Sequence, residues 1–338
     1  MNSIKDHRCQ TGAFGQSPVR NVIVGMIAWL ASLAAPAVIW SNDLSLRNVS
    51  EGFSFEKQND RLAISLGGRP VARFVFRDAK IRRPYFENLK LANGVQVTRN
   101  QPPIEGQDPT DHDTMHPGLW LAFGDVSGHD FWRNKGTLEH VGFDTEPTVK
   151  EGKLTFATQE RFLAADGKRL GRMINRFVLT PLDGSGWMVI WDATITAEAQ
   201  PMVFGDQEEM GFAARVATGI NEKNGGRILS SESIQSAKQT WGQPADWCDY
   251  SGKIGDQPVG IMLMAGRENF RKSWWHNRDY GVFVANPFGR QAMKQGERSS
   301  IEVQPEKPLK LRFGAYLHEG TDIDFAEVFE QFETMQGL

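Results

Sequence analysis

Short apolar runs, separated at regular intervals by turn residues, most constrain what this chain can fold into. Most runs alternate in polarity or are rich in β-branched and aromatic residues, and Gly, Pro, Asn or Asp bound them. Almost no helical period lies between them, so we predict an all-β sandwich or barrel and not a βαβ architecture. The expected strands are 62–66, 71–76, 95–98, 119–123, 137–143, 153–158, 173–180, 187–196, 212–217, 259–265, 280–285, 300–303 and 309–317.

One helix is expected at the C-terminus. Apolar residues there follow the i, i+3, i+4, i+7 spacing of an amphipathic helix. They are Phe325, Val328, Phe329, Phe332 and Met335. Residues 321–324 before them resemble a capping box with Asp in the Glu position. We expect this helix to pack on the sandwich and assign it no catalytic role.

Residues 1–41 are expected to lie outside the fold. Arg20 precedes an apolar run of 19 residues, 22–40, and residues 35–37 offer an A-x-A cleavage signature. This pattern predicts a secretory signal peptide. The alternative is a retained N-terminal anchor, because the run is long enough to span a bilayer. Residues 42–338 show no internal repeat or linker and are predicted to form a single β-sandwich domain.

Cysteine usage and charge bound the compartment and the partners. Cys9 would leave with the signal peptide, so Cys248 would stand alone without a disulfide, which fits a bacterial periplasm or surface. We expect Cys248 to be an inert buried thiol. The net charge of -3, with no basic run, argues against nucleic acid as a partner. Membrane contact is expected only if the N-terminal segment is retained.

The stretch 108–132 concentrates three histidines, five aspartates and two tryptophans. Its first part, 108–118, contains two prolines and no apolar periodicity, so it is expected to be a loop. His112 and His116 have a separation seen in metal ligands, and Asp111 and Asp113 are either oxygen ligands or groups that orient the imidazole. The alternative is a loop tied together by Asx turns.

A second cluster surrounds Glu208 and Glu209. On an extended chain these adjacent side chains point in opposite directions, so one faces a site while the other faces solvent. Arg215 shares a face with Glu209 on a regular strand. The alternative is a solvated turn with a surface ion pair.

Two further clusters combine aromatic and polar residues. The stretch 240–250 is predicted to be a loop in which Trp241, Asp246 and Trp247 present a stacking platform for a sugar, or else form a buried corner. The stretch 274–281 places His276, an acid–base candidate, two residues before Arg278, a fixed cation.

The order of these motifs resembles a known family. The matching segments are Arg83-Pro84-Tyr85, Val97-Thr98-Arg99, Asp111-His112, Gly118-Leu119-Trp120, Gly124-Asp125-Val126, Asp130-Phe131-Trp132, Gly136 to His140, Trp241-Gly242 to Trp247, Arg278-Asp279-Tyr280-Gly281 and Asn286-Pro287-Phe288-Gly289. Over about residues 80–315 the chain resembles the PmoA-like family of secreted bacterial proteins, a domain of unknown function.

The resemblance implies a β-rich, galactose-mutarotase-like supersandwich of the kind found among genes for glycan breakdown. The family loop reads Asp-His-Pro-His-His-Arg-Gly-Leu-Trp, and this chain lacks its His pair and Arg. Only His112 and, less directly, His116 are carried over. The name of the family refers to a methane oxygenase, but we do not expect that activity here. A membrane monooxygenase subunit needs several spanning helices, and this chain has a single N-terminal apolar run.

Together these features predict an exported carbohydrate-active enzyme, a glycoside hydrolase or a lyase. His112, Glu208, Glu209 and His276 are the catalytic candidates, and a divalent metal bound by His112 and His116 is one alternative for the cofactor. The expected substrate-binding residues are Trp120, Arg215, Trp241, Asp246, Trp247 and Arg278. A non-catalytic glycan-binding protein of the periplasm and a structural envelope protein are the alternative functions.

Overall fold

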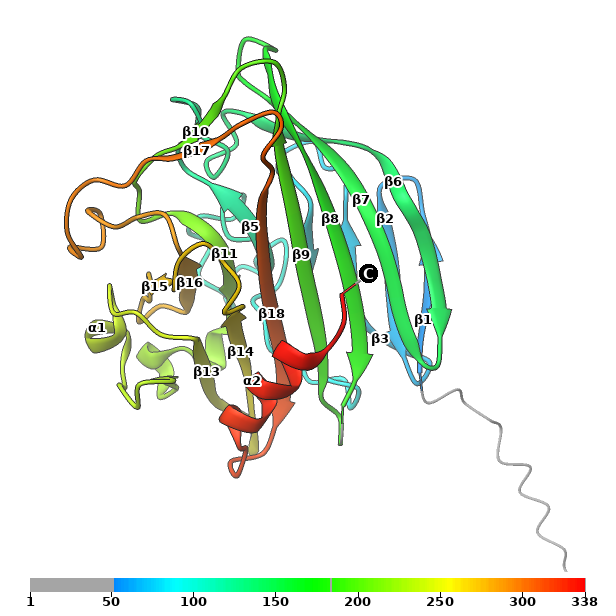
Figure 1. Ribbon diagram of the computed structural model, residues 1–338. Coiled ribbons are helices and arrows are strands. Elements are labelled where there is room, and N and C mark those ends of the chain that lie inside the picture. The colour runs from blue at the N-terminus through cyan, green and yellow to red at the C-terminus, as the bar shows by residue number, and fades with distance from the viewer. Residues whose placement is uncertain (1–51, 183, 338) are drawn as a thin grey trace, which may run out of the picture. The chain divides into compact units, whose positions relative to one another are not determined.

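The computed structural model describes residues 52–182 and 184–337, which belong to one compact unit (Figure 1). The predicted signal peptide, residues 1–41, and Cys9 lie outside the described residues. Two large antiparallel sheets dominate, and together with a C-terminal helix they confirm the predicted all-β sandwich.

Each large sheet has eight strands, and strands named in succession are hydrogen-bonded neighbours. The first sheet contains β1 (Phe53–Lys57), β2 (Arg61–Leu66), β3 (Arg69–Val75), β4 (Tyr85–Glu87), β5 (Leu119–Phe123), β11 (Met210–Arg215), β16 (Val282–Asn286) and β15 (Trp274–Trp275). The second contains β12 (Arg227–Ser230), β13 (Trp247–Ile254), β14 (Gln257–Ala265), β18 (Leu309–Glu319), β9 (Trp187–Ala197), β8 (Arg169–Pro181), β7 (Lys153–Leu163) and β6 (Thr137–Lys150). The smaller elements are the pair β10 (Met202–Phe204) and β17 (Ile301–Val303), the helices α1 (Ala237–Thr240) and α2 (Phe325–Thr334), and the 3-10 turns η1 (Thr218–Ile220) and η2 (Glu222–Asn224).

One predicted strand and one predicted loop need correction. Residues 95–98 form only isolated bridges, Lys90 to Gln96 and Thr98 to Val216, instead of a ladder. The predicted loop 240–250 ends inside β13, because Trp247 to Tyr250 pair with β14. Strands of two or three residues, such as β4 and β15, are too short to show a period in the sequence.

The main core lies between the two sheets. The ring centroids of Phe74 and Phe177 are 4.9 Å apart, and those of Phe177 and Trp191 are 4.7 Å apart. In β11, Met210 and Phe212 point into this core while Ala213 lies in a separate cluster on the other face. This alternation follows from the two-residue period of a strand, and it leaves the first sheet with a second, outward face.

The helix α2 packs on part of the outer face of the second sheet, over β14 and β18 (Figure 1). Phe329 and Phe332 of the helix pack with Met262 and Met264 of β14, as the apolar spacing predicts. The helix is capped by Asp324, whose carboxylate accepts a hydrogen bond from the backbone N–H of Glu327 at 3.0 Å. The capping residue is therefore Asp324, not Thr321.

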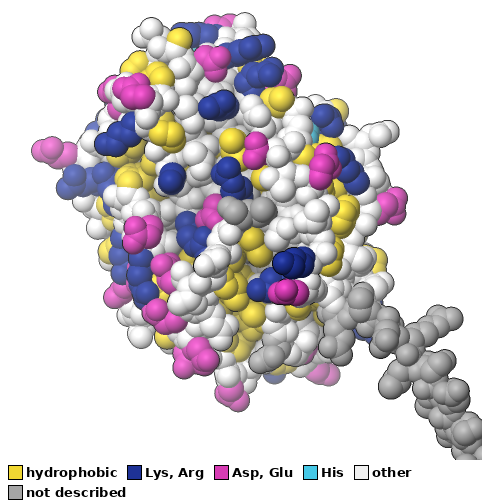
Figure 2. Space-filling model, turned by 45° about the vertical axis from the view of Figure 1, so that its right-hand side comes forward, with side chains coloured by type: hydrophobic (Ala, Val, Ile, Leu, Met, Phe, Trp, Pro, Cys, Tyr) yellow, Lys and Arg dark blue, Asp and Glu magenta, His cyan; other side chains and the backbone are white. Residues whose placement is uncertain are grey.

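Three further sequence predictions concern single features. Cys248 is free and fully buried, and burial raises the pKa of its thiol well above the ordinary value. None of the helices within the described residues combines the length and apolar character needed to cross a bilayer. On the face shown in Figure 2, Lys and Arg side chains are interspersed with Asp and Glu.

Candidate functional site

The outward face of the first sheet carries most of the predicted site residues. At one level across it lie Tyr85 of β4, Trp120 of β5, Ala213 of β11, Val284 of β16 and His276, which follows β15. All five belong to the face opposite the main core, because their neighbours along each strand point inward. The loops 108–117 and 276–281 cross this face.

Two buried arginines fix the loop 108–117. Arg99 donates to the carbonyls of Asp111 at 2.7 Å and His116 at 3.1 Å, and Arg83 donates to the carbonyl of Met115 at 2.6 Å. Burial lowers the pKa of Arg99 to about 10 and that of Arg83 to about 9. Since both guanidinium groups donate to backbone carbonyls of the loop, they position it.

Asp111 and His112 form a carboxylate–imidazole dyad on this loop. His112 has a positive φ of 50°, and its Nδ1 lies 2.8 Å from Oδ2 of Asp111. Arg215 at the end of β11 donates to both carboxylate oxygens of Asp111, at 3.0 and 3.3 Å. Burial works to raise the pKa of Asp111, but the bonds from His112 and Arg215 and the charge of Arg99 hold it below the ordinary value. Asp111 is therefore ionised near neutral pH.

The dyad leaves the other imidazole nitrogen available. The side chain of His112 is 43% exposed, and within the described residues its Nε2 has no hydrogen-bond partner. A carboxylate that accepts from Nδ1–H fixes the tautomer in which Nε2 carries a lone pair. That nitrogen can accept a proton from a ligand at the surface of the sheet.

His116 supports the dyad from below. Its ring stacks between His112, with centroids 5.0 Å apart, and Trp120, with centroids 5.4 Å apart. His116 is buried, and burial together with the charge of Arg215 lowers its pKa well below 6.5. It is therefore a neutral ring in a stacked column.

The structure does not arrange His112 and His116 as the predicted metal pair. Their rings stack at an interplanar angle of 29°, so lone pairs in the two ring planes do not meet at a common ion. No group of three His, Cys, Asp or Glu side chains among residues 52–182 and 184–337 is arranged to hold a metal. The carboxylate nearest to His112 instead takes the position of an orienting group.

Glu208, His276 and Arg278 form a second charged group on the same face. Oε2 of Glu208 accepts from Arg278 at 2.8 Å and lies 3.2 Å from Nδ1 of His276, within ion-pair distance but off the line of a hydrogen bond. Nε2 of His276 accepts from Arg278 at 3.3 Å. Burial lowers the pKa of His276, whereas the neighbouring His276 and Arg278 lower that of Glu208. Glu208 is therefore anionic, and it lies beside a neutral, buried imidazole.

Tyr280 lies between the two groups and was not singled out from the sequence. The guanidinium of Arg215 stands 4.6 Å from its ring centroid. Burial raises the pKa of Tyr280, while Arg215 and Arg278 both act to lower it. The ring therefore lies within electrostatic reach of both charged groups. Its motif, Arg278 to Gly281, was visible in the sequence, but its position against Arg215 depends on the fold.

Four other predicted residues occupy different surroundings. Glu209 forms an ion pair with Arg133, and Asp246 forms one with Lys272 at 3.2 Å. Trp120 is fully buried, and Trp247 packs on Phe325 of α2 at the other sheet. The predicted stacking roles of Trp120 and Trp247 are wrong, because neither indole presents a face to an open groove.

Two pockets flank the dyad. The Tyr85 pocket, about 260 Å³, is lined by Arg61, Arg73, Lys80, Tyr85, Glu87 and Asp113 among others. The Trp241 pocket, about 530 Å³, is lined by Lys238, Trp241, Asn277, Arg278 and Asp279 among others. Asp113 adjoins His112, and Arg278 belongs to the second charged group.

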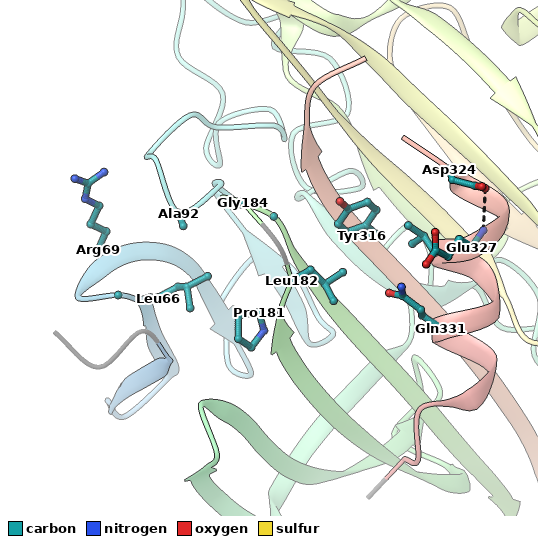
Figure 3. A pocket seen from close by; sticks show the side chains of 13 residues that line it. Leu66, Arg69, Ala92, Pro181, Leu182, Gly184, Tyr316, Asp324, Glu327 and Gln331 are labelled. Atoms are coloured by element: carbon teal, nitrogen blue, oxygen red, sulfur yellow. Dashed lines mark hydrogen bonds between the residues drawn. The ribbon is translucent and has the colours of Figure 1, made fainter. Parts of the chain in front are cut away.

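A larger pocket of about 1050 Å³ lies beside α2 (Figure 3). Tyr316 of β18, Leu182 after β8 and Gln331 of α2 approach one another there. It contains no residue of either charged group on the outward face of the first sheet. Chemistry based on His112 or Glu208 therefore belongs to the first sheet.

The fold and this face define a β-sandwich protein with two histidine–carboxylate groups on one sheet. The chain matches the model described as "Family of unknown function (DUF6807)" over residues 61–332 and belongs to that family. No curated protein matches it. The resemblance to the PmoA-like proteins stays a prediction.

Solved structures similar to this chain come from several organisms. The Slr1438 protein from Synechocystis sp. PCC 6803 has a TM-score of 0.31 and 11% identity, with 79% of this chain and 95% of that chain covered. The GalM/aldose epimerase homologue from C. elegans has a TM-score of 0.32 and 8% identity, with 80% and 99% covered. The galactose mutarotase related enzyme from Lactobacillus acidophilus has a TM-score of 0.30 and 11% identity, with 80% and 98% covered. Likenesses this distant say nothing about function.

Proposed function

We propose that the protein is an exported carbohydrate-active enzyme, a glycoside hydrolase or lyase, in which His112 is the acid–base residue. The observation that carries this proposal is the dyad: Nδ1 of His112 is 2.8 Å from Asp111, and Nε2 lies at the surface without a partner among residues 52–182 and 184–337. General acid–base catalysis requires such a positioned group within reach of the substrate. Export rests on the sequence pattern of residues 20–41.

The groups around the dyad have distinct roles in this proposal. In hydrolysis, Nε2 of His112 takes a proton from water while the water oxygen bonds to the anomeric carbon and the glycosidic C–O bond breaks. In elimination, it takes a proton from a C–H beside a carbonyl while a C=C bond forms and the glycosidic C–O bond breaks. In both cases Asp111 stabilises the imidazolium, which then gives the proton to the departing oxygen. Arg215 holds Asp111 in place through two hydrogen bonds. Glu208 accepts hydrogen bonds from substrate hydroxyls, and Arg278 and Trp241 bind the sugar on the far side of Tyr280.

The test is NMR of the purified protein, residues from about 42 onward, with a panel of glycosides and their 3-keto derivatives. New anomeric signals indicate hydrolysis, and new vinylic signals indicate elimination. We expect turnover that is lost in His112→Ala and retained in the control His129→Ala, which changes a histidine outside both charged groups. If sugars bind but none is converted, the protein is a glycan-binding module and the enzymatic proposal is wrong.

A further inference from the structure

The Tyr85 pocket lies on the outward face of the first sheet, and the Trp241 pocket lies at the edge of the same sheet beyond β16, on the other side of the dyad. Tyr85 and Glu87 belong to β4, and Arg278 pairs with Val282 of β16 through a backbone bond of 2.7 Å. Between them run β5, β11 and β16, and β11 carries the Arg215 that holds Asp111. Four strand spacings separate Tyr85 from His276, or ~19 Å at about 4.8 Å each. A single sugar ring cannot reach both pockets, whereas a chain of linked rings can.

The Tyr85 pocket offers balanced charge. Three cationic side chains (Arg61, Arg73 and Lys80) stand with three carboxylates (Asp78, Glu87 and Asp113). Glu87 is buried, and its Oε1 accepts from Arg73 at 2.6 Å. The phenol of Tyr85 donates to Asp78 at 2.9 Å. Paired donors and acceptors without an excess of either sign suit the hydroxyl groups of a neutral sugar better than an ionic group.

The Trp241 pocket has buried polar atoms that the protein leaves unpaired. Asn277 is 2% exposed, and its Oδ1 has no hydrogen-bond partner within the described residues. The indole Nε1 of Trp241 also has none there. Buried polar atoms are normally hydrogen-bonded, so an acceptor and a donor that are unpaired beside one pocket point to a ligand that carries hydroxyls.

We propose that the substrate is an oligosaccharide of neutral sugars that spans the outward face of the first sheet. One end occupies the Tyr85 pocket, the other occupies the Trp241 pocket, and the linkage that reacts lies between them at His112. This inference rests on the proposed function, since it assigns the substrate class of the same site. It commits to a chain longer than a monosaccharide and to both pockets as subsites.

The test compares sugars of increasing length on variants that block each pocket. Glucose, cellobiose and cellotriose, with the matching mannose and galactose series, are titrated by saturation-transfer NMR and calorimetry. Thr114→Trp fills the Tyr85 pocket and Lys238→Trp fills the Trp241 pocket, while Lys307→Trp changes an exposed lysine elsewhere. Circular dichroism checks that each variant is folded.

We expect one series in which the trisaccharide binds at least about tenfold more tightly than the monosaccharide, and in which either blocking variant removes that gain while Lys307→Trp keeps it. Equal affinity for monosaccharide and trisaccharide, or blocking variants that bind the trisaccharide like the parent protein, overturns the inference. In that case the proposed function still stands if a monosaccharide glycoside is converted and His112→Ala abolishes its conversion. Failure of every sugar to bind or react overturns both.

Discussion

The molecule contains two aspartate–histidine pairs whose oxygen–nitrogen distances are almost equal but whose solvent exposure is opposite. Asp111 and His112 are joined at 2.8 Å on the loop that crosses the first sheet, and their side chains are 40% and 43% exposed. Asp249 and His318 are joined at 2.7 Å inside the second sheet, where the exposed fractions are 0% and 1%. The same pair of residue types therefore occurs once where a ligand can reach it and once where none can.

The nitrogen used for the pairing differs as well. His112 binds Asp111 through Nδ1 and leaves Nε2 at the surface, whereas His318 binds Asp249 through Nε2 and its Nδ1 is buried without a partner among the described residues. The ring of His318 also contacts Phe325 of α2, with centroids 5.3 Å apart. We propose proton transfer only for the first pair, whereas the second joins β13 to β18 beneath the helix.

Removing one member of the buried pair should have the largest effect on folding. Asp249→Ala leaves His318 buried without its partner, which costs about 3–5 kcal/mol in the free energy of unfolding. Urea denaturation measures this directly. The matched variant His112→Ala should change the unfolding free energy by less than about 1 kcal/mol, because the side chain of His112 is 43% exposed and solvated. Similar losses in both variants would erase the distinction between the two pairs.

Asp111→Asn tests whether the exposed pair, unlike the buried one, is needed for activity. The amide keeps the size of the side chain but donates where a carboxylate should accept, so the imidazole loses its fixed tautomer. We expect conversion of the sugar to fall about 100-fold or more, equivalent to roughly 2.7 kcal/mol of barrier. The rate is measured by NMR against Asp144→Asn, a surface control. Unchanged conversion would show that Asp111 does not orient His112.

The low pKa of Asp111 predicts how this pair responds to acid. Because the folded-state pKa lies below 3.8, Asp111 contributes to stability above about pH 4, and that contribution is lost as the pH falls through the folded-state value. A denaturation series from pH 6 to pH 2 should therefore show a smaller acid-induced loss in Asp111→Asn than in the parent protein. An equal loss in both proteins would mean that Asp111 gains nothing from His112 and Arg215.

The smallest expected effect concerns α2, the helix that packs over the buried pair of Asp249 and His318. Asp324→Ala removes the hydrogen bond that caps α2, which costs about 0.5–2 kcal/mol. Hydrogen exchange should then accelerate in α2 more than in β5 or β11. The control Asp322→Ala lies outside the helix and should leave exchange unaltered. Equal exchange rates of α2 in the parent protein and in Asp324→Ala would show that the cap does not stabilise the helix.

The sequence predicted the fold better than it predicted the surroundings of the site residues. Long strands such as β8 and β9 carry several periods of alternation, so their type was predictable, whereas β4 and β15 carry one at most. The adjacency of Asp111 and His112 is visible in the chain. Their link to Arg215 spans 104 residues and depends on β5 and β11 being neighbours.

Sequence patterns could not predict which of the candidate side chains would be buried. Trp120 and Trp241 both stand beside polar residues in the chain, yet Trp120 is fully buried under a loop while Trp241 lines a pocket. Glu208 and Glu209 are adjacent, and only the fold places Glu208 beside His276 and Glu209 beside Arg133. These differences come from contacts between distant segments, which local propensity does not encode.

The most direct test of the account is conversion of the best oligosaccharide by the parent protein, by His112→Gln and by His318→Gln, with the unfolding free energy of each measured in parallel. We expect His112→Gln to lose conversion by about 100-fold or more while its stability stays within about 0.5 kcal/mol of the parent. His318→Gln should lose stability and keep conversion under conditions in which it remains folded. Full conversion by His112→Gln would contradict the claim that the exposed pair performs the chemistry.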